Sequence, residues 1–159
     1  MTRTDSSITD PTRSTCPAHS ARTSRVPASP DAALRAREWV FAELCDAGWP
    51  DAGLRDVALA VDEAVQNAVE HGSVPEAEIR IDLCVDDDVA AVRVRDRGRP
   101  GASPPTGEPC APGDHSIRGR GRLIMANLAD VDWRAARGGG TEVLLHFCAD
   151  DDVGGAGAG

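Results

Sequence analysis

The spacing of the hydrophobic residues changes once along the centre of the chain, and this change constrains the fold more than any other feature. In residues 51–72, apolar side chains recur every three or four positions, which predicts one amphipathic helix. In residues 79–85, apolar and polar residues alternate, and after the acidic stretch 86–88 the alternation resumes over 92–95. Alternation on both sides of a short polar turn predicts two strands joined as a hairpin.

The flanking segments extend this pattern into one domain. They predict a first helix over 31–47, a long loop over 96–118, a short helix opened by Gly119-Arg120-Gly121, and strands over 131–137 and 141–147. This order makes consecutive strands antiparallel neighbours and leaves the helices to cover one face of the sheet. The expected fold class is therefore α+β, a two-layer α/β sandwich with a mostly antiparallel sheet.

The two ends of the chain differ in composition from its centre. Residues 1–28 are rich in Ser, Thr, Arg and Pro, and residues 149–159 are acidic and then Gly/Ala-rich. Segments with so few apolar residues cannot offset the entropy lost on ordering. We therefore expect a disordered arm over 1–28, a folded domain over 29–148 and a flexible tail over 149–159.

The charge balance excludes several functions. The chain has 17 Lys+Arg against 26 Asp+Glu and a formal net charge of -9, which disfavours direct binding to nucleic acid. All 17 basic residues are arginines, so a lysine Schiff base and a lysine-bearing P-loop are both excluded. A phosphate site must then use arginine, backbone amides and metal. No apolar run is long enough to cross a bilayer and no leader is visible, so the expected location is the cytoplasm, without membrane contact.

Glu63 and Asn67 are the most suggestive polar pair in the chain. Four residues apart on a helix, they share one face, roughly opposite the apolar stripe. A carboxylate suits a proton acceptor, and an amide oxygen is a hard ligand that suits Mg²⁺. The alternative interpretation is an ordinary solvated helix face, which is what such a pair most often represents.

Two glycine-containing segments favour the functional interpretation. Asp96-Arg97-Gly98-Arg99-Pro100-Gly101 follows the second predicted strand, where a carboxylate can accept a hydrogen bond from an exocyclic amine. Gly119-Arg120-Gly121 opens a helix whose unpaired amides suit a phosphate. The dispersed Trp39, Trp49 and Trp133 are interpreted as packing residues.

The Glu63/Asn67 helix, the Asp96 segment and the Gly119 segment together resemble the N, G1 and G2 boxes of the GHKL superfamily of ATP-binding domains. Gly140-Thr141 also resembles the entry to the last strand of that family's Bergerat fold. The similarity covers about residues 31–148 and is strongest to the bacterial anti-sigma-factor serine/threonine kinases.

This resemblance implies a role for each residue of the three boxes. Glu63 corresponds to the general base and Asn67 to the ligand of Mg²⁺, while residues 99–118 correspond to the ATP lid. Arg122 departs from the family pattern, because a small residue usually occupies that position. The residues that the resemblance assigns to ATP binding are Asn67, Asp96, Gly98, Gly101, Gly119, Arg120, Gly121 and Thr141.

By resemblance, the expected function is phosphorylation of a serine in a small antagonist protein, alternating with the binding of a sigma factor. ATP and Mg²⁺ are the expected cofactors. The alternative is a nucleotide-dependent interaction module of the same fold without kinase activity. A sensor histidine kinase fragment is disfavoured, because the segment before Pro30 cannot supply a helical hairpin with a phosphoacceptor histidine. Homodimer formation is left open by the sequence.

Overall fold

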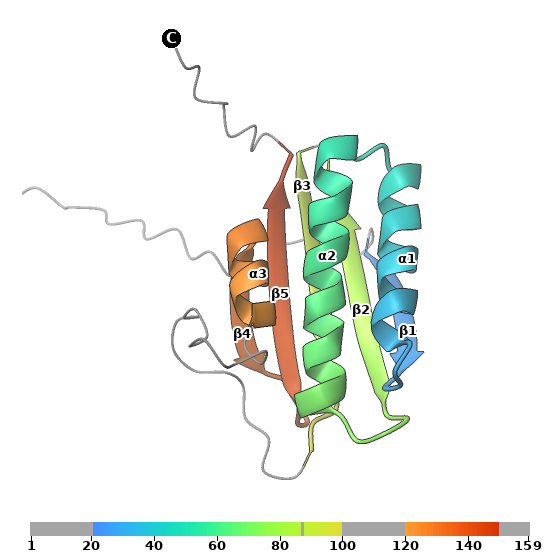
Figure 1. Ribbon diagram of the computed structural model, residues 1–159, viewed down its shortest axis with the longest axis vertical. Coiled ribbons are helices and arrows are strands. Elements are labelled where there is room, and N and C mark those ends of the chain that lie inside the picture. The colour runs from blue at the N-terminus through green and yellow to red at the C-terminus, as the bar shows by residue number, and fades with distance from the viewer. Residues whose placement is uncertain (1–20, 87, 100–119, 150–159) are drawn as a thin grey trace, which may run out of the picture.

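The structure is a computed structural model that describes residues 21–86, 88–99 and 120–149. Its helices α1, α2 and α3 lie along one face of a single sheet, as Figure 1 shows. The predicted α+β class and the two-layer arrangement are therefore confirmed. The arm over residues 1–20, most of the lid loop and the tail beyond Ala149 lie outside the described residues.

The sheet has five strands in the order β1-β2-β3-β5-β4, and every neighbouring pair is antiparallel. The bounds are β1 (Arg22–Pro27), β2 (Glu78–Val85), β3 (Val89–Arg95), β4 (Asp130–Ala135) and β5 (Thr141–Cys148). The β2–β3 hairpin and the β4–β5 pair were both predicted from the sequence. In β5, Val143, Leu145 and Phe147 are buried and alternate with less buried residues, as expected for a sheet covered on one face.

Strand β1 corrects the predicted boundary of the disordered arm. The composition of the sequence places residues 22–27 in that arm, but in the structure they pair with β2 along their whole length. Only Val26 of this strand is buried, so its apolar content gave little signal. Backbone hydrogen bonds to β2, together with Thr23 Oγ1 donating to Asp82 over 2.6 Å, hold this edge strand instead.

Helices α1 (Ala32–Asp46) and α2 (Asp51–Asn67) supply most of the covering layer. Their buried faces repeat with the three-and-four spacing seen in the sequence. Helix α1 packs against β1 and β2, and α2 packs against β3 and β5. The largest fully buried side chains come from both layers: Val40, Leu44, Val57, Val61, Val65, Ile79, Ile81, Leu83, Val92, Val94, Met125 and Leu145.

The second helix does not continue uniformly to Gly72. After Asn67 the backbone widens into a π-helical turn, η2 (Ala68–Gly72), before Ser73 becomes extended. Gly72, the last residue of the helix predicted over 51–72, is not one of the positive-φ glycines. Single π-helical turns of this kind occur frequently at functional sites.

Helix α3 (Arg120–Leu128) begins where the second glycine segment was predicted to open a helix and packs beside α2. The turn between β4 and β5 contains Gly138, Gly139 and Gly140, all with positive φ, as a tight turn of this kind requires. None of the helices in the described part of the chain is both long and apolar enough to span a bilayer.

Candidate functional site

A cavity of about 270 Å³ lies where the end of α2 and η2 approach β3, β5, β4 and the start of α3. Its size is near the lower limit for small-molecule sites. The wall is largely apolar, formed by Ala64, Ala68, Gly72, Val94, Trp133 and Val143. The polar lining residues are Asn67, His71, Asp96, Arg122 and Thr141.

Asp96 is the buried polar group of this cavity, with a relative exposure of 5%. Its Oδ1 accepts hydrogen bonds from the backbone amides of Gly98 (2.8 Å) and Thr141 (3.0 Å), which fix the orientation of the carboxyl group. Burial raises the pKa of Asp96, and the two amide hydrogen bonds partly oppose that rise. A carboxyl group held in this way presents Oδ2 as an oriented acceptor.

Two glycines allow the Asp96 carboxyl to occupy this position. A Cβ atom at Gly72 would lie 2.2 Å from Asp96 Oδ2, and one at Gly140 would lie 2.2 Å from the Asp96 carbonyl oxygen. Real Cβ atoms essentially never show such contacts, so any side chain at either position would displace Asp96 or its backbone. The sequence indicated a helix end at Gly72 but not this contact, which only the tertiary structure reveals.

Gly98 contributes to the cavity through Asp96 rather than by lining it. Its φ is +79°, and a Cβ atom there would lie 2.7 Å from the Gly140 nitrogen. Glycine is therefore required for the close packing of the Asp96 turn against the β4–β5 turn. Direct contact between Gly98 and a base stays a prediction.

Glu63 lies on α2 against the first turn of α3. A Cβ atom at Gly121 would lie 2.4 Å from Glu63 Oε2, so the fold brings the carboxylate and the second glycine segment together. Desolvation raises the pKa of Glu63, and the neighbouring charges of Asp62 and Glu70 raise it further. A raised pKa makes the ionised carboxylate a stronger proton acceptor.

The other predicted site residues are distributed around this centre. Asn67 and Thr141 both line the cavity, one from α2 and one from β5. Arg120 is exposed at the start of α3, where Arg122, the departure from the family pattern, reaches the cavity lining. Gly101 and Gly119 lie outside the described residues.

Two residues near the cavity were not predicted as site residues. Trp133, interpreted as a packing residue, packs against the core and also lines the cavity. Arg99 donates from Nε to the Ser73 carbonyl and from Nη2 to the Val69 carbonyl over 3.0 Å. The arginine thereby ties the segment after β3 to the π-helical turn. Its location in a glycine-rich segment gave no sign of this role.

Comparison with known proteins agrees with this geometry. The histidine kinase-like ATPase domain family matches residues 26–147. A search of curated proteins gave no significant match. Among solved structures, the crystal structure of the RsbU and RsbW domains of Rv1364c from Mycobacterium tuberculosis is similar, with a TM-score of 0.59 and 21% sequence identity.

That structural match covers 80% of this chain but only 31% of the other chain. At this identity it establishes a shared fold and nothing more specific. The family match over residues 26–147 includes every element that lines the cavity: α2, η2, β3, α3, β4 and β5 up to its penultimate residue. The chain therefore belongs to the family of histidine kinase-like ATPase domains.

Proposed function

We propose that this domain binds Mg-ATP with the adenine base against Asp96. The observation that carries the proposal is a buried carboxyl group, fixed by two backbone amides, at an otherwise largely apolar cavity. The exocyclic amine of adenine is a hydrogen-bond donor and suits Oδ2. The apolar wall suits the faces of the base, as is usual for small-molecule sites.

The residues present also suit a magnesium ion that arrives with the nucleotide. No cluster of three or more His, Cys, Asp or Glu residues that could hold a metal occurs in the described ranges. Mg²⁺ commonly needs only one or two protein oxygens when phosphates supply others. Asn67 would provide an amide oxygen at the cavity edge, and the ion would neutralise charge on the phosphates.

Arginine and backbone amides would complete the phosphate site in this lysine-free chain. The start of α3 lies beside Glu63 and contains Arg120 and Gly121. The amides of a first helical turn are unpaired within the helix and favour anions. Gly101 and Gly119, which lie outside the described residues, are also proposed to contribute to nucleotide binding.

We further propose that Glu63 is the general base for phosphoryl transfer to a serine hydroxyl. The serine oxygen forms a bond to the γ-phosphorus while the bond from that phosphorus to the β–γ bridging oxygen breaks. The hydroxyl proton passes to Glu63, and ADP leaves. Positioning and charge neutralisation supply most of the rate enhancement in such reactions, so one oriented carboxylate is sufficient.

The proposed substrate is a small antagonist protein and the proposed second partner is a sigma factor. This assignment rests on the similarity of the three sequence boxes to anti-sigma-factor kinases. The fold that the chain shares with a structure containing an RsbW domain supports the same class of regulator. A cytoplasmic location agrees with such partners.

The test compares Glu63→Gln with Asp56→Asn, which changes an exposed carboxylate elsewhere on the same helix in the same way. Calorimetry measures Mg-ATP affinity, and transfer of labelled γ-phosphate to candidate antagonist proteins measures activity. Both variants should bind Mg-ATP within about threefold of the wild type, while Glu63→Gln alone loses transfer by about 100-fold or more.

Equal transfer by the wild type and Glu63→Gln would remove Glu63 from the role of base. If the wild type binds Mg-ATP but phosphorylates none of the antagonist proteins that it binds, the chain is a nucleotide-dependent interaction module instead of a kinase.

A further inference from the structure

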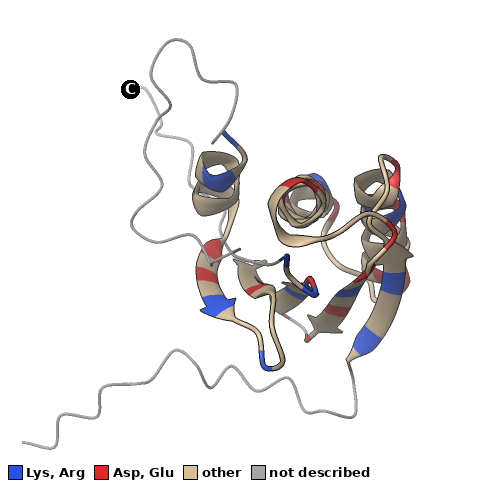
Figure 2. Ribbon diagram, turned by 90° about the horizontal axis from the view of Figure 1, so that it is seen from below, with Lys and Arg blue, Asp and Glu red and all other residues tan. Residues whose placement is uncertain are grey.

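The outer face of the sheet carries a second feature, separate from the cavity under the helices. The helices all pack on the opposite face, and no described element covers this one (Figures 1 and 2). Its side chains belong to the alternate residues of each strand that do not enter the core. Most of these residues in β1, β2 and β3 are charged.

Three arginines lie next to each other across this face. Arg25 of β1 is paired with Arg80 of β2, and Arg80 is paired with Arg95 of β3. Residues directly opposite in neighbouring strands have close Cβ atoms, and like charges in such positions are destabilising. A protein with a net charge of -9 thus places a row of positive charges across β1, β2 and β3 on its open sheet face.

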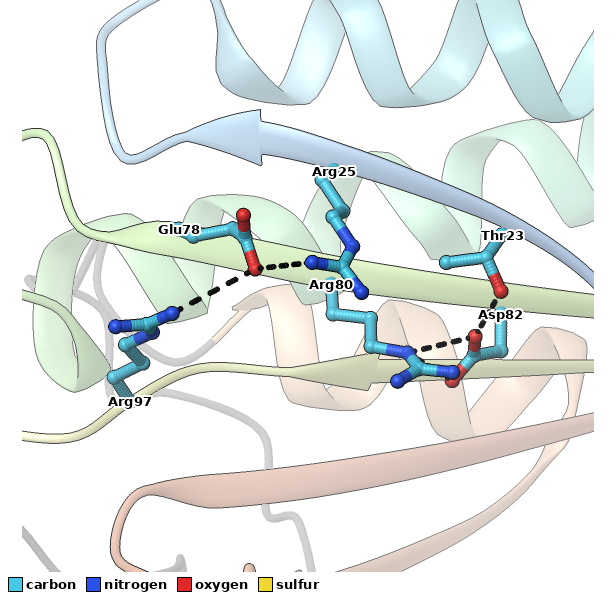
Figure 3. Close-up of polar contacts among 6 residues, drawn as sticks. All are labelled: Thr23, Arg25, Glu78, Arg80, Asp82 and Arg97. Carbon is cyan, nitrogen blue, oxygen red and sulfur yellow. Dashed lines mark hydrogen bonds and ion pairs between the residues drawn. The ribbon is translucent and has the colours of Figure 1, made fainter.

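The acidic residues nearby do not balance this row. Figure 3 shows Glu78 between Arg25 at 3.3 Å and Arg97 at 3.8 Å, so one carboxylate serves two arginines. Arg80 contacts Asp82, a residue of its own strand, at 2.9 Å. Positive charge therefore exceeds negative charge among these five residues.

The arginines also border a hollow into which an acidic group fits. A cavity of about 510 Å³ is lined by four arginines and two acidic residues beside the turn between β4 and β5: Arg25, Glu78, Arg80, Arg95, Asp96, Arg97, Gly138 and Gly139. Arginine presents several donors in a planar fork that matches a carboxylate. We propose that this outer-face arginine cluster (Arg25, Arg80, Arg95 and Arg97) binds an acidic segment of a partner protein.

An acidic peptide suits the cluster better than a nucleic acid does. Glu78 and Asp82 stand within the basic row, and Glu142 lies close to Arg93 at 3.6 Å. These carboxylates would repel a continuous phosphate backbone, whereas spaced carboxylates on a peptide can each reach one arginine. The acidic character of the remaining surface further disfavours a long polyanion.

The test measures binding of a fluorescein-labelled peptide of five Glu-Gly repeats, whose carboxylates are spaced, to the full chain by fluorescence anisotropy. The variant is Arg25→Glu/Arg80→Glu, and Arg55→Glu is the control because Arg55 is exposed on α2, within the opposite layer. The double variant should weaken peptide binding by about tenfold or more, while Arg55→Glu should remain within about twofold. Raising the salt concentration should weaken wild-type binding.

Mg-ATP affinity provides an independent check that the double variant is folded, because neither Arg25 nor Arg80 lines the nucleotide cavity. The proposal is overturned if the double variant binds the peptide as tightly as the wild type, or if the wild type does not bind it at low salt. Tighter binding of a ten-nucleotide oligothymidine than of the peptide would overturn it in favour of a nucleic-acid site. Sedimentation showing a dimer that only the double variant abolishes would overturn it in favour of a self-association surface.

Discussion

Replacement of Gly72 by alanine should destabilise the fold by displacing the Asp96 carboxyl group. The new Cβ atom would lie 2.2 Å from Oδ2 and 2.5 Å from Cγ, so the carboxyl must move. Movement breaks the amide hydrogen bonds from Gly98 and Thr141, each worth about 1.5 to 3 kcal/mol when the acceptor is charged. Alanine would regain about 0.4 to 1 kcal/mol by restricting the unfolded chain. The expected net loss is about 2 to 6 kcal/mol.

Urea denaturation of the four proteins in a double-mutant cycle measures this effect. The cycle contains the wild type, Gly72→Ala, Asp96→Ala and the double variant. In the Asp96→Ala background, which lacks the carboxyl group, Gly72→Ala should be neutral or slightly stabilising. The backbone at residue 72 does not have a positive φ and therefore does not require glycine. The reasoning is refuted if Gly72→Ala is as stable as the wild type, or if it causes the same loss in the Asp96→Ala background.

Three further predictions concern the site. Phosphoryl transfer should decline as the pH falls toward the raised pKa of Glu63, and pH–rate profiles should place this decline above the pH expected for an ordinary glutamate. Arg99→Ala should accelerate hydrogen exchange in residues 69–73, because the Val69 and Ser73 carbonyls lose their donor; unchanged exchange would exclude this role. Trp133→Phe should abolish the change in intrinsic fluorescence on adding Mg-ATP, whereas a change that persists would originate from Trp39 or Trp49.

Asp96 also affects stability as a function of pH. Burial raises its folded pKa above 3.8, so the folded state binds the proton more tightly than the unfolded state does. The stability of the wild type relative to Asp96→Asn should therefore fall as the pH rises through the folded pKa and then level off. Urea denaturation across this range measures the difference, and a rise with pH would contradict the assignment.

The sequence predicted those parts of the fold in which hydrophobic spacing is strong. The alternation in β2 and β3 and the apolar stripe of α2 follow from burial on one face, so both were visible without tertiary information. Strand β1 was missed because its residues are mostly polar and its pairing depends on the backbone of β2. Edge strands of this kind are specified by their neighbours more than by their own composition.

Only those features of the candidate site that depend on local spacing could be predicted from the sequence. The spacing of Glu63 and Asn67 on one helix is a local property, whereas the contact of Gly72 with Asp96 joins segments that are far apart in the chain. The inclusion of Trp133 in the cavity likewise depends on the position of β4 at the edge of the sheet. Such contacts carry no local pattern that one sequence can reveal.

The most direct test of the central claim is calorimetry with Mg-ATP and Mg-GTP on the wild type and Asp96→Asn. Asparagine can retain the Oδ1 acceptor for the two amides, but it presents an NH₂ donor in place of Oδ2. That donor opposes the amine of adenine and suits the carbonyl oxygen of guanine. The wild type should prefer Mg-ATP, and Asp96→Asn should lose about tenfold or more in ATP affinity with much less effect on GTP. No detectable binding of Mg-ATP by the wild type, or an equal loss for both nucleotides, would contradict the account.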